Sequence, residues 1–176
     1  LDTQGSELEI LGGAAALLRD SVLALQVEVE FAPMYTDQPL FGDVDAHLRG
    51  YGFSLFDLTR YRGRRATLAH HQPTRGQLLW GQALYLRDHD RLPTTQQQLR
   101  LAVLASFYQC DDYALEIVDQ LPNTLSSAEQ AAAAAVGRRR GHAAVLREHG
   151  QRPGQGLLGG LLLAARGRAG RVRQRP

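Results

Sequence analysis

A chain of 176 residues is long enough for one domain with a hydrophobic core. Its hydrophobic content of 44% includes no run of eighteen apolar residues, so no membrane span is predicted. The single cysteine, Cys110, excludes an internal disulfide and a cysteine-rich metal site, and it suits the cytoplasm. The net charge of +2 is unevenly divided, because residues 1–137 carry −7 and residues 138–176 carry +9. The basic character therefore belongs to the C-terminal segment alone.

The first eighteen residues predict the end of a strand, a tight turn and then a helix. Ser6 and Glu9 have the spacing of a capping box, so we expect the helix to begin at Ser6. Its apolar stripe consists of Leu8, Leu11, Ala15 and Leu18. Asp2 and Gly5 lie in the turn, and open α/β sheets bind ligands outside the carboxyl ends of their strands. Because the chain opens inside such a turn, without methionine, we expect it to be the C-terminal part of a longer protein.

The following elements alternate between strand and helix. We expect a strand over residues 22–31, a helix over 40–49, a strand over 53–58, a polar arginine-rich loop over 59–76 and a final strand over 77–87. The first turn, helix and strand form half of a βαβ unit, which predicts parallel pairing and a right-handed crossover. The order predicts the second half of a doubly wound α/β sheet whose last strand returns antiparallel.

Three helices are predicted to follow the sheet. They cover residues 95–109, with a capping box of Thr95 and Gln98 and a stripe of Leu99, Val103 and Phe107; residues 111–121; and residues 126–149, capped by Ser126 and Glu129. The Gly- and Arg-rich residues 151–176 are predicted to be disordered. We therefore expect three parts: 1–90 with the sheet, 91–150 as a helical extension, and 151–176 as a tail.

Four strings in this order resemble the C-terminal half of FkbM-type methyltransferases: LDTQGSELEILGGA, LQVEVEF, PMYTDQPLF and LRGYGFSLFDL. The resemblance runs from Leu1 to about Arg87. It implies a class I methyltransferase fold, S-adenosylmethionine as cofactor, and methylation of hydroxyl groups on small molecules or sugars. The family's glycine-rich cofactor loop and ribose-binding acid have no counterpart in this chain. We therefore expect the isolated chain to be inactive.

Methyl transfer to a hydroxyl needs alignment of the reactants and a base that takes the proton. Asp2 is the first candidate, as a catalytic and cofactor-binding residue together with Gly5 as a cofactor contact; the alternative is a carboxylate that only caps the turn. Glu28 and Glu30 lie on one face at the end of a strand expected to be central, where both faces are normally apolar. We expect Glu28 to be catalytic and Glu30 to bind the acceptor. Alternatively, this face is solvated because the strand lies near an edge.

Glu7 and Tyr35 are the remaining candidates for acceptor binding. Glu7 also suits the helix dipole, and Tyr35 also suits packing in the loop after the strand. No metal is predicted, because His70 and His71 are adjacent and lack a third ligand at metal spacing. The Arg60–Arg65 cluster is either a solvated face or a contact for an acidic acceptor, and no specific nucleic acid is expected.

Two other functions are compatible with the sequence. One is a non-catalytic interaction module built on the helices after Thr95, which resemble a helical-repeat pair. The other is a doubly wound enzyme with a different cofactor, such as a nicotinamide. The oligomeric state is not predicted.

Overall fold

The structure, a computed structural model, describes residues 1–66, 74–121 and 125–136. Residues 1–136 form one compact unit. The predicted disordered tail, the second half of the helix expected to reach residue 149, and the pair His70 and His71 lie outside the described residues. The three predicted parts of the chain therefore stay predictions.

The first predicted helix is divided in two. Helix α1 spans Glu7–Gly13 and helix α2 spans Ala15–Asp20. Ser6 precedes α1, but its hydroxyl donates a hydrogen bond to the Thr3 carbonyl at 3.2 Å instead of capping the helix. The predicted capping box with Glu9 is therefore wrong. The helix does begin where expected, within one residue.

Three strands form one sheet in the order β1-β3-β2. They are β1 (Ala24–Glu30), β2 (Phe53–Gly63) and β3 (Gln77–Arg87). Strand β3 is antiparallel to both neighbours, which confirms the predicted return of the last strand. Strand β2 extends five residues beyond its predicted end, because residues 59–63 pair with the first half of β3. The ring of Tyr61 stacks on that of Trp80 across this extension, with centroids 3.8 Å apart.

The predicted parallel pairing involves a single residue. The amino group of Leu1 donates to the Gln26 carbonyl at 2.6 Å, and the Leu1 carbonyl accepts from the Glu28 amide at 2.9 Å. In a parallel pair, one residue hydrogen-bonds to the two residues that flank its partner, and Leu1 does this with the neighbours of Val27. These two hydrogen bonds lie on the edge of β1 that faces away from β3. The structure is thus a mixed α/β fold, as predicted, and the described residues contain a three-stranded antiparallel sheet. That this sheet is half of a doubly wound sheet stays a prediction.

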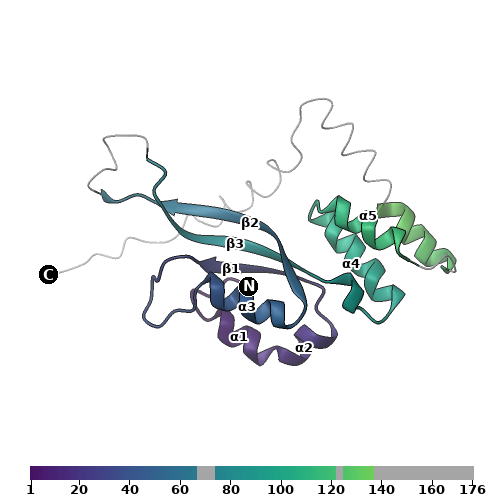
Figure 1. The fold of residues 1–176 in the computed structure, drawn as a ribbon, viewed down its shortest axis with the longest axis horizontal. Helices are drawn as coiled ribbons and strands as arrows, with labels where there is room; N and C mark the ends of the chain where they lie inside the picture. The colour runs from purple at the N-terminus through teal and green to yellow at the C-terminus, as the bar shows by residue number, and fades with distance from the viewer. Residues whose placement is uncertain (67–73, 122–124, 137–176) are drawn as a thin grey trace, which may run out of the picture. The chain divides into compact units, whose positions relative to one another are not determined.

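Helices cover both faces of the sheet. On one face lie α1, α2 and α3 (Phe41–Gly50), which appear below the strands in Figure 1. The core on that side contains Leu11, Leu18, Val27, Val29, Val44, Leu48, Phe53, Ala83 and Tyr85. A short 3-10 turn, η2 (His89–Arg91), leads from β3 to α4 (Thr95–Phe107) and α5 (Asp111–Asp119). These two helices form the second core, which includes Leu84, Leu86, Leu101, Ala102, Ala105, Ala114 and Ile117.

Helix α4 differs from its prediction in cap and buried face. Its N-cap is Thr94, whose hydroxyl accepts from the Gln97 amide at 3.2 Å, so the predicted cap is displaced by one residue. Of the predicted stripe, Val103 is 47% and Phe107 64% exposed. The reason is that α4 packs on both the sheet and α5, so the buried face includes Leu101 instead.

The third predicted helix begins as expected. Residues 127–136 are helical, and the carboxylate of Glu129 accepts from the Ser126 amide at 2.8 Å while the Ser126 hydroxyl accepts from the Glu129 amide at 3.4 Å. This reciprocal pair confirms the predicted capping box. No helix in the described parts of the chain is both long and apolar enough to cross a bilayer.

A buried arginine joins the sheet to α2. The guanidinium of Arg87 donates to the carbonyls of Leu18 and Arg19, the second at 2.9 Å, and lies 5.1 Å from the centre of the Phe53 ring. Backbone carbonyls at a helix C-terminus have no partner within the helix. Arg87 therefore satisfies the end of α2 and fixes it against β3.

Candidate active site

The turn from Asp2 to Gly5 is held by the carboxylate of Glu7. One oxygen accepts from the Thr3 amide at 2.6 Å and the Thr3 hydroxyl at 3.0 Å, and the other accepts from the Gly5 amide at 2.9 Å. Burial raises the pKa of Glu7, but these hydrogen bonds outweigh it and leave the pKa below its usual value. Glu7 is thus an ionised carboxylate that shapes the turn. Its predicted role in acceptor binding stays a prediction.

The backbone conformation of this turn explains why residue 5 is a glycine. Gly5 has φ +107°, which side-chain-bearing residues rarely adopt. A Cβ atom at Gly5 would also lie 3.2 Å from Nε2 of Gln38. The space beside Gly5 is therefore filled by the Gln38 side chain. A cofactor contact at Gly5 stays a prediction.

Glu28 and Glu30 project from one face of β1, as predicted, but this face is not solvated. Glu28 is 6% exposed and Glu30 is 3% exposed. Their partners on β3 are Gln82 and Trp80. The alternative of a solvated edge is therefore wrong, although β1 is not central among the three described strands.

The environment of these two carboxyl groups favours their protonated forms. Burial, followed by a hydrogen bond to Asp2 and the negative charges of Asp2, Glu30 and Glu7, raises the pKa of Glu28 to about 7. Burial, followed by the charge of Glu7, raises the pKa of Glu30 as well. A carboxyl group that titrates near neutrality can accept and release a proton at physiological pH. The predicted catalytic role of Glu28 stays a prediction.

Gln4 connects three of the predicted residues. Its amide nitrogen Nε2 donates to Oδ1 of Asp2 at 3.3 Å and to Oε2 of Glu28 at 3.3 Å. Its Oε1 accepts from the hydroxyl of Tyr35 at 3.3 Å. We call Asp2, Gln4, Glu28, Glu30 and Tyr35 the acidic site. Sequence reasoning missed Gln4, although it lies between Asp2 and the glycine of the predicted turn.

The loop over residues 32–39 covers the turn through Gln38. The Oε1 atom of this buried side chain accepts from the amides of Met34 at 2.9 Å and Tyr35 at 3.2 Å. Met34 and Tyr35 themselves are 47% and 53% exposed. Tyr35 therefore lies exposed at the rim of the acidic site, and its role in acceptor binding stays a prediction.

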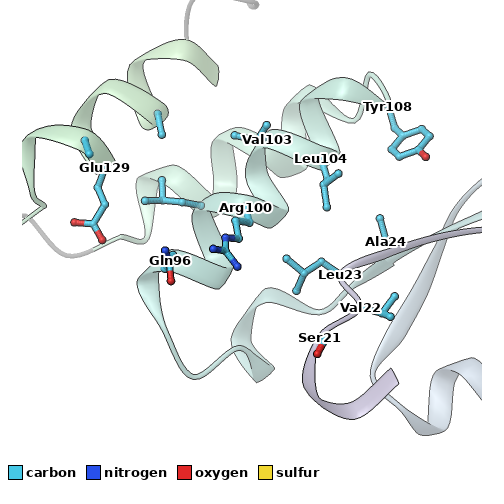
Figure 2. Close-up of a pocket in the computed structure, with 13 residues that line it drawn as sticks. Ser21, Val22, Leu23, Ala24, Gln96, Arg100, Val103, Leu104, Tyr108 and Glu129 are labelled. Atoms are coloured by element: carbon cyan, nitrogen blue, oxygen red, sulfur yellow. The ribbon is translucent and has the colours of Figure 1, made fainter. Parts of the chain in front are cut away.

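Two further observations concern metal binding and a cavity in the fold. Among the described residues, no group of three His, Cys, Asp or Glu side chains is arranged to hold a metal ion. A cavity of about 790 Å³ lies between the start of β1 and α4, and Figure 2 shows Leu104, on α4, and Leu23, just before β1, among the residues that line it. None of the residues that line this groove belongs to the acidic site.

Helices on both faces of a sheet, with carboxylates beside the end of one strand, define an α/β protein with a candidate ligand site at that strand end. Residues 1–55 match the model of a family described as Methyltransferase FkbM domain, so this part of the chain is similar in sequence to that family. The match confirms the resemblance to this family and contains the whole acidic site, but it ends within β2 rather than near Arg87. That the chain corresponds to the C-terminal half of the family's domain stays a prediction. No curated protein and no solved structure matches the chain.

Proposed function

We propose that this chain is part of an S-adenosylmethionine-dependent methyltransferase that methylates a hydroxyl group of a small molecule or sugar. The observation that carries the proposal is the position of Glu28. This buried carboxyl group has a pKa of about 7 and lies beside Asp2, within the segment that matches a methyltransferase family. A hydroxyl acceptor requires a base of this kind.

The charge of the acidic site fits a cationic cofactor. The negative charges of Asp2 and of the neighbouring Glu7 raise the pKa of both Glu28 and Glu30, and none of the ion pairs in the described parts of the chain involves these four carboxyl groups. S-adenosylmethionine carries a positive sulfonium and supplies the activated methyl group when bound. The exposed carboxylate of Asp2 is the group that would hold the cofactor, through its positive charge or its ribose hydroxyls.

The roles of the chain's own residues follow from their burial. The ionised form of Glu28 takes the proton of the acceptor hydroxyl on a carboxylate oxygen, which makes the hydroxyl oxygen nucleophilic. Glu30, on the same face, accepts a hydrogen bond from a neighbouring hydroxyl of the acceptor. Tyr35 is exposed at the rim and contacts the acceptor from the loop. Burial of both glutamates keeps water from competing for these positions.

Calorimetric titration of S-adenosylmethionine tests the proposal. We expect weak or no binding by this chain, because it has no counterpart of the family's glycine-rich loop, and binding by a chimera in which the loop-containing segment of an FkbM-family protein precedes Leu1. In this chimera Asp2→Asn should weaken binding, whereas Glu9→Gln, on the exposed face of α1, should not. Absence of binding by both forms would contradict the proposal. It would favour the interaction module, with the groove of Figure 2 as its candidate surface.

A further inference from the structure

The backbone of Gln4 adopts an unusual conformation. Its φ is +60°, in the left-handed region that few residues other than glycine occupy, and Gly5 follows with φ +107°. A left-handed backbone is strained for a residue with a side chain and persists where its surroundings hold it. Here the holding group is the Glu7 carboxylate, which accepts from the amides of Thr3 and Gly5 on both sides of Gln4. The turn thus maintains a strained position at the edge of β1.

The strained backbone brings one side chain to three partners from separate segments. An amide group has two donor hydrogens and one acceptor oxygen. Gln4 uses the donors for Asp2 and Glu28 and the acceptor for Tyr35, each at 3.3 Å. We propose that Gln4 is a positioning residue, which holds the Glu28 carboxyl group beside Asp2 and ties both to the loop that carries Tyr35. This inference rests on the proposed function, because it assigns Gln4 a role in orienting the base.

The surroundings of Glu28 explain why a neutral donor matters there. The ionisable groups that face it are the carboxyl groups of Asp2, Glu7 and Glu30, and all of them disfavour its charged form. The Gln4 amide offers a hydrogen bond to that charged form. Removal of the amide therefore makes Glu28 harder to ionise and frees its carboxyl group to rotate away from Asp2. A residue with a merely structural role would not change this titration.

The test is a titration of Glu28 followed by carboxyl ¹³C NMR on the whole chain, with the Glu28 signal identified by its loss in Glu28→Gln. Two variants remove the amide: Gln4→Gly, which relieves the left-handed strain, and Gln4→Met, which keeps the length of the side chain. We expect both to raise the Glu28 midpoint by about one pH unit. The matched control is Gln26→Ala, which removes the amide of an exposed glutamine on β1, the strand that carries Glu28. It should leave the Glu28 midpoint near its wild-type value.

The outcomes separate this inference from the proposed function, because the titration needs neither cofactor nor acceptor. A Glu28 midpoint that stays at the wild-type value in both Gln4 variants overturns the assignment, whatever the cofactor titration shows. A midpoint that rises as much in Gln26→Ala overturns it too, because the effect would then not belong to the amide of Gln4. A rise confined to the Gln4 variants supports it, even if S-adenosylmethionine fails to bind and the proposed function falls.

Discussion

Replacing Glu28 by glutamine should stabilise the fold at alkaline pH. Glutamine resembles the protonated carboxyl group in shape but cannot ionise. The pKa of Glu28 in the folded chain is raised from an ordinary 4.5 to about 7, chiefly by burial. The folded state therefore binds a proton more tightly than the unfolded state. The stabilisation from this proton is complete below about pH 4.5 and is lost as the pH rises through about 7.

The magnitude follows from the size of the shift. Each pKa unit corresponds to about 1.4 kcal/mol, so the interval from 4.5 to about 7 corresponds to about 3 kcal/mol in full. Between about pH 5 and about pH 8 the wild-type chain should lose about 2 to 3 kcal/mol of this stability, because Glu28 is already partly ionised at pH 5 in the unfolded state. Glu28 is 6% exposed, so solvent screening reduces the effect little.

Urea unfolding followed by the fluorescence of Trp80, the single tryptophan, measures this difference. At each pH, the free energy of unfolding of the wild type is subtracted from that of Glu28→Gln. This difference should be larger at about pH 8 than at about pH 5. Taking this difference removes the titration of other groups that both chains share. Glu9→Gln, at an exposed position of α1, is the control and should show no pH-dependent difference. An equal effect of Glu28→Gln at both pH values would refute the reasoning.

Two further substitutions test the packing and capping of the fold. Arg87→Met keeps the aliphatic stem but removes the donors to two carbonyls at the end of α2. The free energy of unfolding, measured in the same urea experiment, should therefore fall by about 1 to 3 kcal/mol. The control Arg91→Met, at an exposed position, should change it little. Thr94→Ala should lower the free energy of unfolding by about 1 kcal/mol, because α4 loses its N-cap. Thr95→Ala should lower it clearly less, as measured by thermal unfolding. A larger loss in Thr95→Ala than in Thr94→Ala would show that Thr95 is the cap, as the sequence predicted.

The elements with an unambiguous period were predictable from the sequence. Strand β3 was expected over residues 77–87 and lies there, because its two short apolar runs, residues 78–80 and 83–86, fit a strand with a neighbour on each side. The extension of β2 over residues 59–63 was missed, since these polar residues become a strand only through pairing with β3. The cap of α4 was ambiguous because Thr94 and Thr95 each have a glutamine three residues later.

The acidic site was predictable in its carboxylates but not in its connections. Asp2 and Glu28 follow from the rule that ligand sites lie at the carboxyl ends of strands, and the structure brings them together. Gln4 has no comparable signature, because a glutamine in a turn is usually solvated. Its contacts depend on a left-handed backbone that the Glu7 carboxylate holds in place. Such a conformation is a property of the assembled turn, so sequence patterns do not reveal it.

The cost of the acidic site is itself an argument for function. Burial and mutual repulsion raise the pKa of Glu28 and Glu30, so near neutral pH both residues reduce the stability of the fold. Apolar residues at these two buried positions would suit the strand better. Proteins tend to break such local rules where a binding or catalytic site requires it. A positively charged ligand beside Asp2 would lower the pKa of Glu28 and recover part of the lost stability, which is the coupling expected of a base that works next to a sulfonium.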